Sequence, residues 1–279
     1  MKLLETKTFE GKSRYVLSFP DNVNTVSLEL HHDILNNEED EVYEESGYDN
    51  YWKYSLFVDN IEEVYRSLNP KFVKGVPFQF KDIGYLMHTR DTENYSIEYI
   101  QKFFKNNSTP TTTIESLPLK EIPVFGLITL RTKDPLKSIK SYEHLFELKF
   151  LVRMYVDHGN GRGFTLYFLG PKHLQPPNEL DLDAIENREW MYQQKESFIE
   201  LQYYWGSEQD FNLEYTDRSD KAVGLKGIVF ETSDLNDVIL KLRRSNISTI
   251  KQKEEISQEK VLFLRSPDNQ KIIIREARD

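Results

Sequence analysis

The chain has 279 residues, a formal net charge of −10 and a pI of about 5.3, with 13% aromatic and 29% charged residues, a composition typical of a soluble globular protein. Its charge repels phosphate groups, so we expect neither a broad nucleic-acid surface nor an anionic-membrane surface. The sequence has no cysteine, which excludes disulfides, thiolate nucleophiles and zinc–thiolate sites, and no apolar run approaches the length of a membrane span.

The first part of the chain predicts short strands and one helix. The expected strands are 2–9, 13–19, 25–30, 51–59, 71–74, 83–89 and 95–101. An acidic, Asn-rich stretch at 36–50 is typical of a solvated loop. The helix at 60–69 places Ile61, Val64 and Leu68 on one face, and Pro70 ends it.

A polar segment with several threonines and prolines then predicts a linker at 105–121. It divides the chain into an N-terminal domain, 1–104, and a C-terminal domain, 122–279. The C-terminal strands are expected at 125–132, 149–156, 164–170, 198–204, 225–232, 248–251, 260–266 and 271–277. Helices are expected at 134–148, where Asp134 is the N-cap and Pro135 the first helical residue, and at 237–246.

The elements repeat in a fixed order. The unit strand–helix–strand–strand–strand recurs at 50–100, 124–205 and 222–276, and incompletely at 1–30. The sequence GNGRG at 159–163 joins two strands, which favours a hairpin turn over a phosphate loop. An α+β protein built from paired βαβββ modules is therefore expected.

Several motifs in this order resemble glyoxalase I (lactoylglutathione lyase), of the vicinal-oxygen-chelate superfamily. They are LITLRTKDPLKSIKSYEHLFELKFL, FTLYFLG, FIELQYYWGSEQD, GLKGIVFE and FLRSPDNQKIII, with weaker counterparts in the first half such as TVSLELHHD and YSIEYI. The resemblance spans nearly the whole chain. It implies two domains with curved, U-shaped mixed sheets in a monomer of pseudo-dimeric modules.

The family holds a Zn or Ni ion with a Gln, a His and two Glu from facing modules, and a Glu moves a proton of the methylglyoxal–glutathione hemithioacetal. In the inner pair of modules the two Glu positions carry Glu98 and Glu200. The His position carries Lys53, and the Gln position carries Leu127. An ammonium between two acids would replace the metal, so no cofactor is expected. The alternative is a Zn or Ni ion held by the two acids and waters.

In the outer pair, the resemblance implies that only one ligand is kept. Glu29 occupies a Glu position, whereas Leu225 and Ile273 replace the His and the other Glu. His31 shares the strand face of Glu29, so these two could form a weak partial metal site or a hydrogen-bonded pair in a half-buried cleft.

The resemblance also implies glutathione-binding groups. A family Arg is kept as Arg131, for which the alternative is a surface ion pair with Asp134, and family lysines correspond to Lys74 and Lys81. A family Asn is replaced by Tyr204. We therefore expect a small anionic ligand or a glutathione adduct near Arg131, Lys53 and Lys74.

Taken together, the residues favour a glyoxalase I-like protein with degenerate sites and little or no lactoylglutathione lyase activity. The alternatives are a lyase that uses Glu98 and Glu200 of the inner site as catalytic residues, and a module that binds a partner. The first module lacks the opening strand and helix that the family has. An intracellular location is expected, either cytoplasmic or, if a presequence was removed, organellar.

Overall fold

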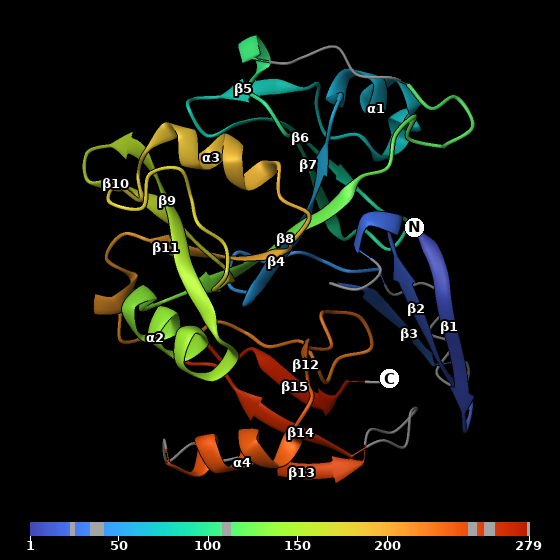
Figure 1. Cartoon of the computed structure of the whole chain (residues 1–279), viewed down its shortest axis with the longest axis vertical. Coiled ribbons are helices and arrows are strands. Elements are labelled where there is room, and N and C mark those ends of the chain that lie inside the picture. The colour runs from blue at the N-terminus through green and yellow to red at the C-terminus, as the bar shows by residue number, and fades with distance from the viewer. Residues whose placement is uncertain (23–25, 34–41, 108–112, 245–249, 254–259, 278–279) are drawn as a thin grey trace.

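The computed structural model describes residues 1–22, 26–33, 42–107, 113–244, 250–253 and 260–277. Figure 1 shows a large sheet flanked by two smaller ones, which contain the two ends of the chain. Four short 3₁₀ turns, η1 to η4, lie at Pro20–Asn22, Pro70–Phe72, Lys105–Asn107 and Ser207–Gln209.

The large sheet has eight strands. Their order is β5 (Phe78–Phe80), β6 (Gly84–Arg90), β7 (Ser96–Gln101), β4 (Tyr51–Val58), β8 (Val124–Thr132), β11 (Phe198–Tyr204), β10 (Arg162–Pro171) and β9 (Leu148–Gly159). The first strands of two repeats, β4 and β8, pair antiparallel at its centre, and each lies parallel to the last strand of its own repeat. The sheet therefore contains strands from both sides of the linker predicted at 105–121. The division of the chain into two domains at that linker stays a prediction.

Helices α1 (Ile61–Ser67) and α2 (Pro135–Phe146) each follow the central strand of their repeat. Asp134 caps α2 by accepting the Lys137 N–H, and Pro135 fills the first turn, as predicted. The predicted hairpin between β9 and β10 is confirmed. Its residues 159–161 all have positive φ, which glycine and asparagine tolerate.

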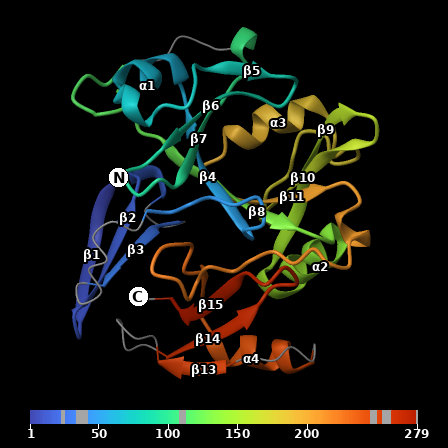
Figure 2. The same ribbon diagram turned by 180° about the vertical axis from the view of Figure 1, so that it is seen from behind.

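The polar insertion between β10 and β11 contains a helix that we did not predict, α3 (Ile185–Tyr192). Figures 1 and 2 show α3 beside β6, β9 and β10. Its buried Met191 and Tyr192 belong to the same core cluster as Leu127 and Phe168. The Tyr192 hydroxyl donates to the Ile83 carbonyl, 3.0 Å away in the β5–β6 turn. Thus α3 joins the two halves of the large sheet.

The two smaller sheets come from the ends of the chain. One has the order β1 (Lys2–Phe9), β2 (Lys12–Ser18), β3 (Leu28–Asp33). The other has the order β12 (Ile228–Thr232), β15 (Lys271–Glu276), β14 (Lys260–Arg265), β13 (Ile250–Lys253), with helix α4 (Leu235–Arg244). Asp234 starts α4 by accepting the N–H groups of Asn236 and Asp237.

One predicted strand is wrong. The segment 71–74 follows Pro70, which starts the 3₁₀ turn η2, and the edge strand β5 forms later, at Phe78–Phe80. Proline at the first position favours a helical turn and removes a strand donor. Residues 36–41 of the predicted acidic loop, 108–112 of the linker and 248–249 of a strand lie outside the described residues.

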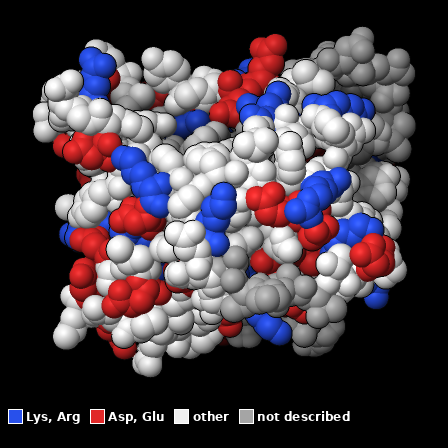
Figure 3. Space-filling view, turned by 90° about the horizontal axis from the view of Figure 1, so that it is seen from above, with Lys and Arg blue, Asp and Glu red and all other residues white. Residues whose placement is uncertain are grey.

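The face drawn in Figure 3 carries acidic and basic side chains interspersed with uncharged ones. No single-sign patch dominates that face. Among the described residues, none of the helices combines the length and the apolar character needed to cross a membrane.

Candidate functional site

The central strands of the large sheet place a row of polar side chains on one face. Cross-strand pairing aligns His88 with Glu98, Glu98 with Ser55, Lys53 with Thr129, and Thr129 with Glu200. Because directly opposed residues share a face of a sheet, and Lys53 and Ser55 lie two residues apart on β4, these side chains lie on one face in two adjacent lines, which together we call the polar row. The structure thus brings together the three polar inner-site residues of the predicted set, Lys53, Glu98 and Glu200.

Lys53 and Glu98 form a buried ion pair. The Lys53 Nζ lies 2.6 Å from the Glu98 Oε1, and the Ser55 hydroxyl donates to the Glu98 Oε2 at 2.7 Å. Both ionised side chains are at most 5% exposed. Although burial raises the pKa of Glu98, the charge of Lys53 and the contact with His88 lower this pKa well below its usual range. Glu98 therefore stays ionised and holds the ammonium group in place.

Glu200 is in a different state. It is 3% exposed, and its Oε1 has no hydrogen-bond partner. Burial raises the pKa of Glu200 to about 7, helped by the charge of Glu98 and opposed by that of Lys53. Within the part of the chain that the structure describes, Lys53 forms no ion pair with Glu200. The expected bridge therefore reaches one acid, and the second is largely neutral below pH 7.

The residues present do not fit the family's metal ion. Leu127 is fully buried and offers no donor atom, and the Lys53 ammonium occupies one oxygen of Glu98. Among the described residues no group of three or more His, Asp or Glu side chains is arranged to hold a metal. Two carboxylates beside an ammonium are a poor donor set for Zn or Ni, because the ammonium repels the ion.

Two further site residues were not predicted, Trp52 and His88. A β-bulge between Tyr51 and Lys53 in β4 lets Trp52 turn toward the polar row. The Lys53 Nζ lies 4.2 Å from the centroid of the Trp52 ring, which also stacks on His88 at 6.2 Å. The His88 Nε2 lies 3.2 Å from the Glu98 Oε1 and has no other polar contact as close.

His88 is the most exposed side chain among the charged and imidazole groups of this row. Its side chain is 34% exposed, whereas those of Lys53 and Glu98 are almost fully covered. The alternation of side chains along β6 could have predicted that His88 belongs to this face. His88 lies two residues after Leu86, which belongs to the core cluster on the same face as Leu127.

Arg131 is a structural residue in this fold. It is 3% exposed, and its Nη1 donates to the carbonyls of Ser46, Asp49 and Tyr51 at 2.9–3.2 Å. The surface ion pair with Asp134 is therefore not formed. Three backbone acceptors hold this guanidinium group, so it is engaged in fixing the segment that precedes β4.

The predicted lysines and Tyr204 lie farther out. Lys74 is exposed, and its N–H donates to the His88 carbonyl at 3.0 Å, which places its backbone beside the exposed end of the polar row. The Lys81 Nζ donates to the Asp157 carbonyl at 2.9 Å. Tyr204 is 43% exposed at the end of β11 and packs on Phe164.

In the outer pair of modules, two guanidinium groups contact the Glu29 carboxylate. The Glu29 Oε1 accepts from the Arg275 Nη2 at 2.6 Å, and its Oε2 lies 3.8 Å from the Arg14 Nη1 and 3.6 Å from the His31 Nε2. Burial raises the pKa of Glu29, but His31, Arg275 and Arg14 together lower it to about 2. Arg275, which we did not predict, holds the carboxylate, and Ile273 next to it supplies no ligand.

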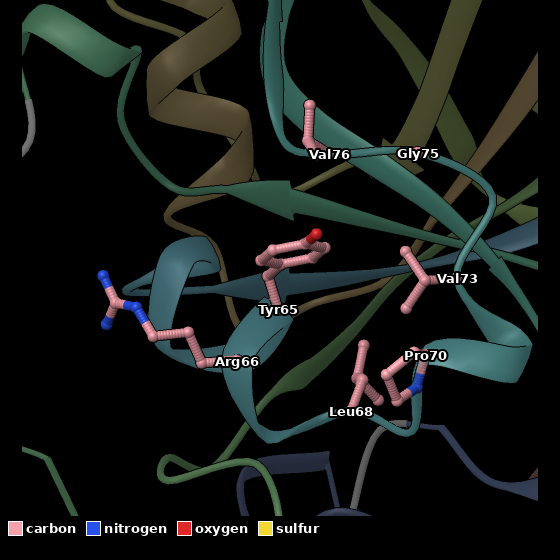
Figure 4. A pocket seen from close by; sticks show the side chains of 7 residues that line it. All are labelled: Tyr65, Arg66, Leu68, Pro70, Val73, Gly75 and Val76. Atoms are coloured by element: carbon pink, nitrogen blue, oxygen red, sulfur yellow. The ribbon is translucent and has the colours of Figure 1, made fainter.

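A pocket of about 400 Å³ lies beside the residues that flank Lys74 (Figure 4). It is lined by Tyr65, Arg66, Leu68, Pro70, Val73, Gly75 and Val76. None of the predicted site residues lines it, and its lining contains no carboxylate or imidazole. It is therefore not a candidate for acid–base or metal chemistry.

Comparison with known proteins gives a consistent picture, although no family model matches the chain. A lactoylglutathione lyase from Pseudomonas aeruginosa is 27% identical over 174 residues, which cover 62% of this chain and 94% of that protein. A glyoxalase I from Saccharomyces cerevisiae is 28% identical over 141 residues, half of this chain and 40% of the yeast protein.

Among solved structures, glyoxalase I from Zea mays superposes with a TM-score of 0.64 at 18% identity, over 99% of this chain and 83% of the maize protein. At that identity the likeness shows the fold alone. The sequence similarity and the fold together show that the chain resembles glyoxalase I.

Proposed function

We propose that this chain is a metal-independent glyoxalase I-like protein that binds a small anionic ligand and has little or no lactoylglutathione lyase activity. The observation that carries the proposal is the 2.6 Å ion pair between Lys53 and Glu98. The ammonium neutralises the charge of Glu98 and, with Leu127 in place of a ligand, leaves a divalent ion too few free donor atoms at this site.

The packing of α3 supports the same proposal. Tyr192 and Met191 are fully buried in the cluster that also contains Leu127. The charges of Glu98 and Glu200 both act on the Tyr192 hydroxyl, so we expect this buried side chain to occupy space that a hemithioacetal over the two acids would need.

The ligand is expected at the exposed end of the row, where His88 and the backbone of Lys74 adjoin. Arg131 is occupied by three carbonyls, so we assign anion binding to His88, Lys74 and the field of Lys53 instead. An imidazole N–H and an exposed ammonium suit a carboxylate such as those of glutathione.

One specific observation favours a second function, an active lyase. Glu200 is buried, lacks a partner at Oε1 and has a pKa raised to about 7, which are properties of a general acid–base group. In that case Glu98 and Glu200 would catalyse the reaction although the Gln and His ligands of the family's metal site are absent.

A turnover assay separates the two. The purified chain is incubated with methylglyoxal and glutathione, alone and with Zn²⁺, Ni²⁺ or Co²⁺, and S-lactoylglutathione is measured. We expect no turnover above the protein-free blank. Turnover that disappears in Glu200→Gln would establish the lyase.

Ligand binding is tested in parallel by thermal shift with glutathione and S-lactoylglutathione, because a ligand raises the melting temperature with its concentration. We expect a rise that is lost in the double variant His88→Ala/Lys74→Ala and kept in the control Lys71→Ala, which changes another exposed lysine of the same segment. No rise with either compound would contradict the proposed ligand class.

A further inference from the structure

The register of three strands places a buried serine between two cationic residues. Ser96 on β7 is directly opposed by Lys53 on β4 and by Arg90 on β6. Directly opposed residues share a face of a sheet, so Arg90 and Ser96 extend the polar row beyond Lys53. Ser96 is 6% exposed, and the Arg90 side chain is 23% exposed. A hydroxyl flanked by a guanidinium and an ammonium is a donor set that suits a carboxylate.

A carboxylate of the chain itself occupies this position. The Glu45 Oε2 accepts a hydrogen bond from the Ser96 hydroxyl at 2.6 Å and lies 2.8 Å from the Arg90 Nη2. Glu45 belongs to the segment 42–50, which precedes β4, and its side chain is 20% exposed. Glu45 therefore stands where an acidic group of a ligand would bind, with solvent on its other side.

The donors of this position keep their arrangement when Glu45 moves. The Arg90 Nη1 donates to the Asn94 carbonyl at 2.8 Å, and this bond orients the guanidinium group from the neighbouring turn. Departure of Glu45 leaves Arg90 and Ser96 without this acceptor and adds one positive charge to the row. Partly buried donors without an acceptor are costly, so the position is preorganised for an external carboxylate.

The backbone is held on both sides of Glu45, so only its side chain has to move. The Tyr43 N–H donates to the Glu93 carbonyl at 3.0 Å, and the Ser46 carbonyl accepts from the Arg131 Nη1 at 3.0 Å. Partly exposed side chains change rotamer much faster than segments unfold. A rotation of Glu45 into solvent therefore opens the position while the segment 42–50 stays in place.

We propose that Ser96 and Arg90 form a carboxylate-binding position and that Glu45 is its built-in competitor. The inference rests on the proposed function and names its ligand class more closely, because His88 lies two residues before Arg90 on the same face of β6. Such residues are about 7 Å apart along a strand. The ligand therefore has two acidic groups, one for His88 and Lys74 and one for Ser96 and Arg90.

The probe is glutarate, a dicarboxylate that can span this distance, titrated into the full chain in a calorimeter. Glutarate has to displace Glu45 in the original chain but not in Glu45→Ala. We expect its dissociation constant to fall about tenfold or more in Glu45→Ala, because the binding-competent state is then fully populated. Glu45→Gln, which removes the charge and keeps the size, should show part of this gain. Glutaramide, the uncharged diamide, should bind none of these chains.

Two further variants separate this position from a general loss of negative charge. Glu44→Ala removes the charge of the exposed neighbouring residue and should leave the dissociation constant of glutarate unchanged. Glu45→Ala/Ser96→Ala lacks the hydroxyl donor and should lose the gain. Circular-dichroism melting checks that each variant is folded, and Glu45→Gln takes the place of Glu45→Ala if the latter is not.

Equal affinity for glutarate in Glu45→Ala and the original chain, including no detectable binding to either, would overturn the inference. An equal gain in Glu44→Ala, or a gain that survives Ser96→Ala, would overturn it as well. Failure of the proposed function is seen separately, as the lack of a thermal shift with glutathione and S-lactoylglutathione in the original chain. A glutarate gain specific to Glu45→Ala supports the carboxylate position in either case.

Discussion

Lys53 and Glu98 lie on neighbouring parallel strands, and their charged atoms are 2.6 Å apart in a region that solvent barely reaches. Ser55, which lies on the same strand as Lys53, donates a hydrogen bond to the other oxygen of the Glu98 carboxylate. A buried charge that has lost its partner is costly, whereas a buried pair is tolerated. The first two predictions below follow from this ion pair between Lys53 and Glu98.

Lys53→Met should lower the free energy of unfolding by about 3–5 kcal/mol at pH 7, because it leaves Glu98 buried and ionised without its cation. Urea unfolding followed by tryptophan fluorescence measures this. The double variant Lys53→Met/Glu98→Leu removes both charges and should recover most of the loss. If the single and the double variant are equally unstable, the loss comes from packing around Trp52 and not from charge.

Restoring the family's ligand types should restore a metal site. Lys53→His with Leu127→Gln places an imidazole and an amide beside Glu98 and Glu200, and removes the repelling ammonium. We expect one equivalent of Ni²⁺ or Zn²⁺ per chain by elemental analysis and calorimetry, with affinity about 100-fold or more above that of the original chain. Leu127→Gln alone is the control. One equivalent of tightly bound metal in the original chain would contradict the Lys53 interpretation.

Glu200 should make stability depend on pH in the direction opposite to most carboxylates. Its pKa is about 7 in the folded chain and near its ordinary 4.5 when unfolded, so the folded state holds the extra proton between these values. The free energy of unfolding therefore falls as the pH rises from about 4.5 to about 7, by at most about 3 kcal/mol for this group.

Glu200→Gln removes that dependence. The variant should gain stability relative to the original chain between pH 4.5 and 8, as measured by urea unfolding at several pH values. Glu214→Gln, at an exposed glutamate, should show no such gain. An equal difference between Glu200→Gln and the original chain at pH 4.5 and pH 8 would show that folding does not raise the pKa of Glu200.

Glu29, the carboxylate of the outer pair of modules, should make the protein less stable as the pH falls, as most carboxylates do. The pKa of Glu29 is lowered to about 2, so its stabilisation is present above the unfolded value near 4.5 and is lost as the pH falls through about 2. Arg275→Leu should cost about 1–3 kcal/mol at pH 7, and less at pH 3, where the lone carboxyl is protonated. Differential scanning calorimetry at both pH values checks this against Arg243→Leu, an exposed arginine on α4. A cost equal at both pH values would point to lost packing.

The repeat order and the capping of α2 could be predicted because they depend on near neighbours in the chain. Asp134 and Pro135 act within one helical turn, and strand alternation assigns Glu98 and Glu200 to a face without knowledge of their partners. Helix α3 was missed because its stabilisation is tertiary. Tyr192 bonds to Ile83, a residue 109 positions earlier, and the helix itself has little amphipathic pattern.

The sequence by itself determined the repeat order and the faces on which Glu98 and Glu200 lie, since these follow from residue identity and local periodicity, and the resemblance to a family added the expectation that Lys53 stands at a ligand position. Only the tertiary structure decided that Lys53 pairs with Glu98 and leaves Glu200 neutral, that Arg131 is consumed by three backbone carbonyls, and that Arg275 closes the outer site. The physical reason is that desolvation and charge pairing depend on groups brought together from distant parts of the chain, which no local pattern records.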